Sequence, residues 1–159
     1  MTPPYLIVRR FPYEEPHLTE LEFRASNGSF SGAIDFFCGV EDLAEIGAAL
    51  KVFPSKAQDE FVYEYGSDDP DNRDYRRFRL RIYAVDHAGH CAVQFYADVR
   101  EKTPNEGVCT FSIRAEPAAL HRLGQLFENF HKLEHLELQW SPSGGALFTE
   151  HQAEFWRAN

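Results

Sequence analysis

The chain has 159 residues, the size of one domain at about 100–200 residues per domain. It is 43% hydrophobic and 26% charged, which excludes wholesale disorder and fibrous classes, and no run approaches the ~18 apolar residues of a membrane helix. The formal net charge of −9 argues against a general binder of nucleic acid or anionic membranes. We therefore expect neither nucleic acid nor a membrane as a partner.

The cysteines and the N-terminus favour the cytoplasm. Cys38, Cys91 and Cys109 form an odd set without a CxxC motif, which is typical of buried, reduced thiols. The first residues lack the charged start and long apolar core of a secretory signal.

Alternating polarity predicts a first hairpin. Residues 18–25 alternate apolar and polar side chains, and a second strand is expected over about 29–37. Between them, Asn27-Gly28 favours a two-residue type I′ turn. The implied cross-strand pairs are Leu21 with Ile34, Phe23 with Gly32, and Ala25 with Phe30.

A second hairpin is predicted over residues 75–86 and 90–101, with Ala88-Gly89 at the turn. This turn pairs Leu80 with Ala97, Ile82 with Phe95, and Ala84 with Val93, and it sets Arg79 opposite Asp98. A third strand, 108–115, follows a loop that contains Pro104 and Gly107.

Two segments change to the helical period. Residues 40–53 and 117–132 carry the same apolar stripe, including Gly47 and Gly124, at a constant offset of 77 residues. Strands precede each helix, and one alternating strand follows each, over 60–66 and 135–140. We interpret this as an internal β-β-β-α-β duplication with halves near 1–70 and 73–140. A glycine costs about 1 kcal/mol inside a helix, so a repeated one indicates close approach to the sheet.

The predicted fold class is α+β, a single domain over 1–159. Two layers are expected: a twisted, largely antiparallel sheet with both helices on one face. The segment from Ser141 to Gly145 predicts a break in regular structure. Residues 146–158 predict a short amphipathic segment that docks through Leu147, Phe148, Phe155 and Trp156.

The opposite face of the sheet should carry polar side chains, mixed in charge and rich in tyrosine and arginine. From the first strands it should include Glu20, Glu22, Arg24 and Asp35. The acidic residues concentrate in the first half, where residues 1–77 hold 15 of the 25. Tyrosine and arginine are favoured in protein interfaces, and an acidic patch steers a basic partner. The competing interpretation is a solvated sheet face with cross-strand ion pairs. The candidate partner-binding residues are Glu60, Glu64, Asp68, Asp69, Asp71, Arg77, Arg79, Arg81, Tyr83 and Tyr96.

No motif for catalysis, nucleotide binding or metal binding is complete. The loop from Asp68 to Asp74 resembles a calcium loop in composition only. His87, His90 and Cys91 lie close in sequence but lack a second ligand pair for zinc. We therefore assign no catalytic residue, no metal ligand and no cofactor, and do not expect an enzyme.

Two short motifs carry a resemblance. Leu50-Lys51-Val52-Phe53-Pro54, the turn from Asp86 to His90 and the strand–helix order resemble a loose group of small bacterial proteins, some of them similar to toxin-immunity proteins. The similarity spans about residues 30–135. It implies a cytoplasmic, non-enzymatic binder of a cognate toxin, often a basic nuclease.

We thus expect a non-catalytic protein-binding domain that occludes a basic partner. One alternative is a small-ligand protein or an enzyme of unrecognised type, with a pocket between sheet and helices near His121, His131 or His135. Another is a structural component that self-associates through strand edges or the C-terminal segment.

Overall fold

The computed structural model describes residues 3–13, 15–69 and 75–153. Its strands and helices confirm the predicted α+β class with antiparallel pairing. Neither helix in these ranges is long and apolar enough to cross a membrane. The elements are β1 (Tyr5–Phe11), β2 (Leu18–Ser26), β3 (Ser31–Gly39), α1 (Val40–Lys51), β4 (Glu60–Tyr65), β5 (Arg76–Ala84), β6 (Cys91–Val99), β7 (Gly107–Ala115), α2 (Pro117–Phe130), β8 (Glu137–Ser141) and β9 (Gly144–Phe148).

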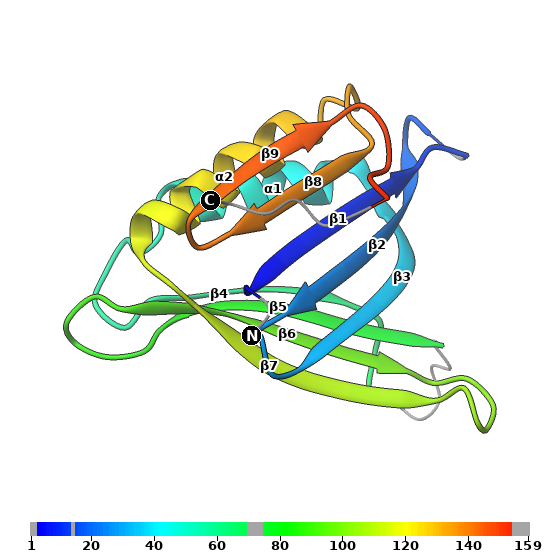
Figure 1. Ribbon diagram of the computed structural model, residues 1–159, viewed down its shortest axis with the longest axis horizontal. Coiled ribbons are helices and arrows are strands. Elements are labelled where there is room, and N and C mark those ends of the chain that lie inside the picture. Colours follow the sequence, from blue (N-terminus) through cyan, green and yellow to red (C-terminus); the bar gives the residue numbers. More distant parts are fainter. Residues whose placement is uncertain (1–2, 14, 70–74, 154–159) are drawn as a thin grey trace.

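The strands divide between two sheets instead of forming one. Sheet A has the order β3-β2-β1-β8-β9, and sheet B has the order β4-β5-β6-β7 (Figure 1). The division follows from the pairing of the two predicted halves, since β4 pairs with β5 and β8 pairs with β1. Each half therefore gives its last strand to the sheet that the other half begins.

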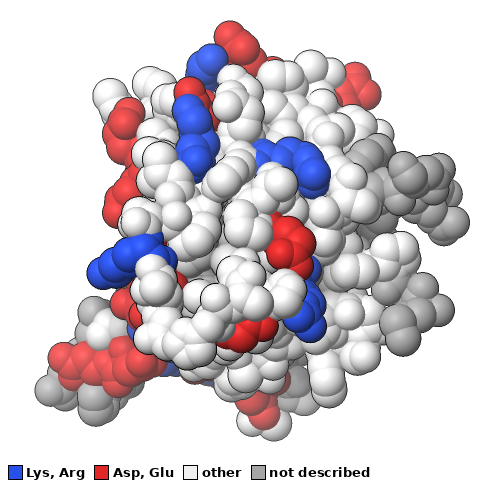
Figure 2. Space-filling model, turned by 90° about the vertical axis from the view of Figure 1, so that its left-hand side faces the viewer, with Lys and Arg blue, Asp and Glu red and all other residues white. Residues whose placement is uncertain are grey.

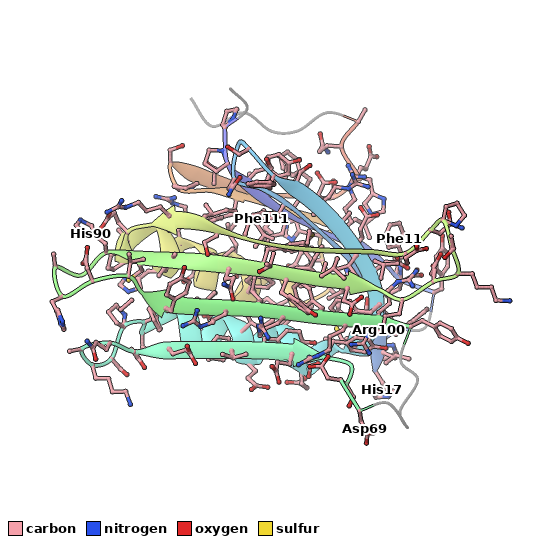
Figure 3. The ribbon with its side chains drawn as sticks, turned by 90° about the horizontal axis from the view of Figure 1, so that it is seen from below. Phe11, His17, Asp69, His90, Arg100 and Phe111 are labelled. Atoms are coloured by element: carbon pink, nitrogen blue, oxygen red, sulfur yellow. The ribbon has the colours of Figure 1, made fainter. Side chains whose placement is uncertain are left out.

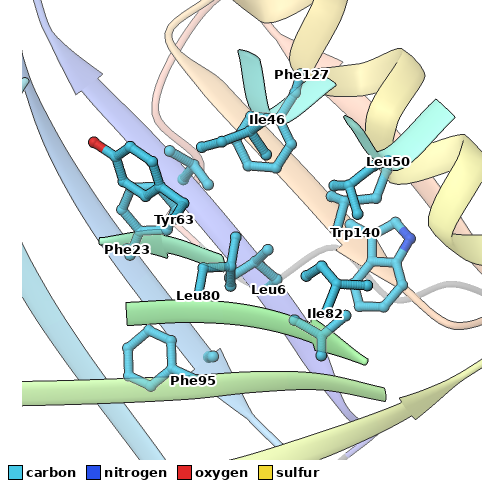
Figure 4. Packing of buried hydrophobic residues seen from close by; sticks show 14 of the residues in the cluster. Leu6, Phe23, Ile46, Leu50, Tyr63, Leu80, Ile82, Phe95, Phe127 and Trp140 are labelled. Atoms are coloured by element: carbon cyan, nitrogen blue, oxygen red, sulfur yellow. The ribbon is translucent and has the colours of Figure 1, made fainter. Parts of the chain in front are cut away.

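One hydrophobic cluster joins both sheets and both helices. Figure 4 shows side chains from sheet A (Leu6, Trp140), sheet B (Leu80, Phe95) and α2 (Phe127) packed against one another, and all five are at most 1% exposed. Aromatic rings continue the packing between the sheets, with Phe23 and Phe78 centroids 4.6 Å apart. The interior between helices and sheets is thus filled by apolar side chains.

The first hairpin pairs two residues away from the predicted register. Leu21 faces Phe36, and Ser26 faces Ser31, so the turn holds four residues instead of two. Asn27 explains the difference, because its Oδ1 accepts hydrogen bonds from the backbone N–H groups of Ser29 and Phe30. Gly28 alone among the turn residues has a positive φ, of 95°, whereas a type I′ turn requires two.

The second hairpin differs in the same way. Leu80 faces Phe95, and Ala84 faces Cys91. The Asp86 carboxylate accepts hydrogen bonds from the Ala88 and His90 N–H groups and holds a longer turn, in which Gly89 has a φ of 91°. Both predicted registers were wrong by an even number of residues, so the side chains that pair kept their predicted faces. Phe30, predicted to pair with Ala25 on the apolar face, instead lies in the turn and is 65% exposed.

The repeated glycines bring the helices together, not a helix and a sheet as predicted. A Cβ added to Gly47 would lie 3.0 Å from the Gly124 carbonyl oxygen, and one added to Gly124 would lie 2.9 Å from that of Gly47. At the same crossing, the Lys51 ammonium donates to the Glu128 carboxylate, again 77 residues away. The stripes therefore place glycine against glycine.

Further contacts recur at the 77-residue offset. The Tyr63 hydroxyl of β4 donates to Asp42 of α1 at 2.9 Å, and Trp140 Nε1 of β8 donates to the Ala119 carbonyl of α2 at 2.9 Å. Tyr63 and Trp140 are 77 residues apart, as are Asp42 and Ala119. Each aromatic side chain thus ties the strand that follows a helix to the start of that helix. These recurrent contacts agree with a duplication, and the duplication itself stays a prediction.

The expected break near residue 142 is a tight hairpin. Ser141 pairs with Gly144, so β8 and β9 continue on both sides of Pro142-Ser143. Leu147 packs against the core as predicted, although from a strand. Phe155 and Trp156 lie outside the described residues.

Candidate functional site

The outer face of sheet B is the broad polar surface that the sequence predicted. Figure 3 views this sheet from below, with Arg100 and Asp69 near one end and His90 at the other. The side chains of this face alternate along every strand with side chains that point toward the core, although Arg77 and Ala92 on this face are themselves buried. They are Glu60, Val62 and Glu64 on β4; Arg77, Arg79, Arg81 and Tyr83 on β5; Ala92, Gln94, Tyr96 and Asp98 on β6; and Val108, Thr110, Ser112 and Arg114 on β7.

Part of the predicted surface lies elsewhere. Glu20, Glu22, Arg24 and Asp35 belong to β2 and β3 and so to the outer face of sheet A. The expectation of one continuous face was wrong because the strands form two sheets. Seven of the ten candidate residues do share the outer face of sheet B. They are Glu60, Glu64, Arg77, Arg79, Arg81, Tyr83 and Tyr96.

Three of the acidic candidates form ion pairs with two of the arginines. Arg77 contacts Glu64 at 3.1 Å and Asp68 at 3.3 Å, and Arg81 contacts Glu60 at 2.6 Å. The predicted acidic surface and the predicted Tyr/Arg surface are therefore one surface. The sequence could not show this, because β4 and β5 meet only after the intervening loop has closed.

Within these pairs, the carboxylates are more exposed than the arginines. The Arg77 side chain is 8% exposed, compared with 49% for Glu64 and 68% for Asp68. For Arg81 and Glu60 the values are 33% and 48%. We call Glu60, Glu64 and Asp68 the acidic margin. At this margin an approaching molecule meets carboxylates first, with the arginines beneath them.

Each outward tyrosine supports an arginine. The Arg79 Cζ lies 4.6 Å from the centroid of the Tyr96 ring, and the Arg81 Cζ lies 4.1 Å from that of Tyr83. The Tyr83 hydroxyl is 2.9 Å from the Ser112 hydroxyl of β7, which fixes the ring across three strands. These cation–π contacts hold the guanidinium planes over the sheet.

The loop after β4 is fastened to the end of sheet B. Asp68 accepts hydrogen bonds from Arg77 and from Arg100, and Arg100 also donates to Asp98 at 3.0 Å. Sequence reasoning placed Arg100 on the polar face, within the predicted strand 90–101, but missed its contact with the loop, and the strand ends one residue earlier, at Val99. Asp69 is exposed in this loop, and Asp71 lies outside the described residues.

The Cys38 thiol is buried beside Tyr63 and Asp42. Burial, with a smaller contribution from the Asp42 carboxylate, raises the pKa of Cys38 from 9.0 to about 12. Burial also raises the pKa of Tyr63, and Cys38 and Asp42 add to the rise. Both groups therefore stay protonated at neutral pH. This cluster anchors β4 to α1 and has no nucleophile.

Two of the three histidines named for a ligand pocket contact backbone carbonyl oxygens. His121 Nε2 lies 2.7 Å from the Phe53 carbonyl oxygen, and His131 Nδ1 contacts the Glu128 carbonyl oxygen. His135 has a buried Nδ1 without a partner among the described residues. A shallow open pocket of about 360 Å³ lies elsewhere, beside the β6–β7 turn, and is lined by Tyr75, Glu101, Lys102 and Asn105.

No family model matches the chain, and no curated protein is similar to it in sequence. Among solved structures, it is similar to WHY1 from Arabidopsis thaliana, with a TM-score of 0.49 and 9% identity over 82% of this chain and 85% of that one. The plant transcriptional regulator PBF-2 gives 0.45 and 12% over 82% and 76%. WHY3 from Arabidopsis thaliana gives 0.44 and 14% over 82% and 83%.

These similarities correct one expectation. We expected no nucleic-acid partner from the net charge, and this exclusion is contradicted because a transcriptional regulator is among the similar structures. A net charge describes the chain as a whole and not any one face. Figure 2 shows acidic and basic groups interspersed on one side of the molecule. On the outer face of sheet B, Arg79 and Arg114 have no ion-pair partner among the described residues.

Proposed function

We propose that this chain is a non-catalytic binding protein that covers a basic protein surface with the outer face of sheet B. The observation that carries the proposal is the layering of charge, in which the carboxylates of the acidic margin lie outside the arginines that neutralise them. A surface of this kind attracts cationic side chains and accelerates encounter with a basic protein.

The arginines beneath the acidic margin hold its carboxylates in fixed positions. Arg77 is buried, and besides its two carboxylates it donates to the Tyr65 and Phe78 carbonyl oxygens. Arg81 is held between Glu60 and the Tyr83 ring. Because these contacts fix the carboxylates before a partner arrives, less side-chain entropy is lost on binding.

The resemblance to toxin-immunity proteins supplies the class of partner. A basic nuclease uses cationic side chains to bind phosphate, and an acidic protein surface that occupies those groups would block its substrate. The three free cysteines suit action in a reducing cytoplasm.

The test is capture of partners from lysate of the native organism at about 150 mM salt. We expect the wild-type protein to retain a basic protein in stoichiometric amount. The Glu60→Lys/Glu64→Lys variant should lose it by at least about tenfold, because like charges that face each other across an interface cost several kcal/mol.

A matched control makes the same change of charge elsewhere. Glu45 and Glu134 are exposed near the helices, so Glu45→Lys/Glu134→Lys alters net charge equally and should retain the partner. Equal loss from both variants would show that only net charge matters and would contradict the assigned surface. Tight binding of a single-stranded thymidine oligonucleotide to this face, without a protein partner, would replace the proposal.

A further inference from the structure

We propose that Arg79, stacked on Tyr96, is a socket for one carboxylate side chain of the protein partner. This inference rests on the proposed function and deepens it, because it adds a feature that the partner's surface must have. The partner would carry an Asp or Glu side chain among its basic residues, placed one strand away from the acidic margin.

Arg79 lies at the centre of this face, and none of the described carboxylates forms an ion pair with it. On the same strand, Arg77 and Arg81 each contact a carboxylate. Arg79 instead contacts the Tyr96 ring, and its Nε atom is buried with no hydrogen-bond partner in the part of the chain that the structure describes. The Nε atom is closed to solvent, so an incoming acceptor would meet the two Nη groups, which donate no hydrogen bond to a described residue.

The guanidinium is already oriented for such an acceptor. The ring of Tyr96 fixes its plane on one side, and the tyrosine is itself supported by its place on the central strand β6. A planar guanidinium held in this way presents its N–H groups in a fixed fork, which matches the two oxygens of a carboxylate. Arginine and tyrosine are also the residues most enriched at the energetic centres of interfaces.

The neighbouring charges favour an isolated carboxylate over a chain of phosphates. Glu64 is the direct cross-strand neighbour of Arg79, and its carboxylate is 49% exposed. Strands lie about 4.8 Å apart, so a polyanion that reached Arg79 would also run beside the acidic margin. A protein can instead set a cationic side chain over Glu64 and an acidic one over Arg79, and both contacts are then attractive.

The first experiment tests the chemistry of the socket directly, by NMR titration of the full chain with sodium acetate. Sodium chloride at equal ionic strength is the control. The Arg79 Nε–H is shielded from water, so its signal should persist at neutral pH and should shift saturably with acetate alone. The Tyr96 ring signals should shift with it. In Arg79→Ala the acetate-dependent ring shift should vanish, whereas in Arg114→Ala, which removes an exposed arginine from the same face, it should remain.

Three results would overturn the socket. These are no saturable shift with acetate, a Tyr96 shift that survives in Arg79→Ala, or a shift that a thymidine oligonucleotide produces with higher affinity than acetate and with the same dependence on Arg79. The last result would assign the site to nucleic acid.

The second experiment measures the affinity of the captured partner. Arg79→Ala should weaken binding by about 30-fold, the effect of a typical hot-spot residue, and Arg114→Ala should not. If the Glu60→Lys/Glu64→Lys variant loses the partner but Arg79→Ala binds like Arg114→Ala, the socket is wrong and the proposed function stands. If the acetate result holds and the margin variant keeps its partner, the proposed function is wrong and the socket stands.

Discussion

Replacing Gly124 by alanine should destabilise the protein, although alanine is the better helix former. A Cβ at this position would lie 2.7 Å from the Lys51 nitrogen, 2.9 Å from the Gly47 carbonyl oxygen and 3.0 Å from the Leu50 carbonyl carbon. All three are backbone atoms, so no side-chain rotation relieves the contact. The helices must separate instead.

The size of the effect follows from two opposing terms. Ordinary contact begins near about 3.5 Å, so α1 and α2 must move apart by about 0.5–1 Å, and the contacts between them then lose a quarter to a half of their dispersion energy. Overpacking of this kind costs about 1–3 kcal/mol. We take the upper part of that range, because only backbone atoms can move to relieve the contact. The higher helix propensity of alanine compared with glycine offsets about 1 kcal/mol of this cost. The net loss is about 2 kcal/mol, or a fall in Tm of about 4–8 °C.

Urea unfolding followed by far-UV circular dichroism measures this difference. Ala48→Gly, on the exposed side of α1, reports the propensity difference alone and should cost about 1 kcal/mol. Gly47→Ala fills the same gap from the other helix, so the double variant should lose less than the sum of the single variants. A Gly124→Ala protein more stable than wild type would refute the close approach of the helices.

Three further outcomes are expected. Tyr63→Phe removes the hydroxyl that donates to Asp42 and should cost about 1 kcal/mol in thermal unfolding, whereas Tyr83→Phe, at the surface, should cost less. The raised pKa of Cys38 means that its contribution to stability is complete below pH 9.0 and declines as pH rises toward about 12; Cys38→Ala should flatten this alkaline fall in Tm, and an unchanged slope would contradict the shift. The hydrogen bond from Lys51 lowers the pKa of Glu128, so its contribution is present above the ordinary pKa of 4.5 and is lost as pH falls through the lower value; Lys51→Met should reduce the acid-side slope, with the exposed Lys102→Met as the control.

Periodicity predicted the elements well because it depends on which side chains are buried. The alternation in 18–25 and the stripe in 117–132 both reflect contact with the core, and each led to an element close to the observed one. Turn geometry was less predictable. In both hairpins, one acceptor side chain, Asn27 or Asp86, binds backbone N–H groups and lengthens the turn, and the dipeptide rule takes no account of this.

The candidate site was predicted in its residues and not in its arrangement. The alternation of side chains along β5 identified Arg77, Arg79 and Arg81 as outward, and the structure places all three on one face. The order of charge from the interior to the surface depends on how far each side chain reaches, and no pattern in the sequence encodes it. The distinction between Arg79 and its neighbours is of the same kind, because it requires the position of each carboxylate on β4.

The exchange of strands between the two halves has a consequence for the integrity of the chain. β1 is completed by β8, as in the Arg9–Glu137 contact across 128 residues, so sheet A closes only when most of the sequence has been made. Neither half can complete its own sheet, since each needs its fourth strand from outside. Two copies of one half could supply that strand to each other. On the predicted duplication, this architecture would correspond to a two-subunit assembly whose subunits are joined between β4 and β5 into a single polypeptide.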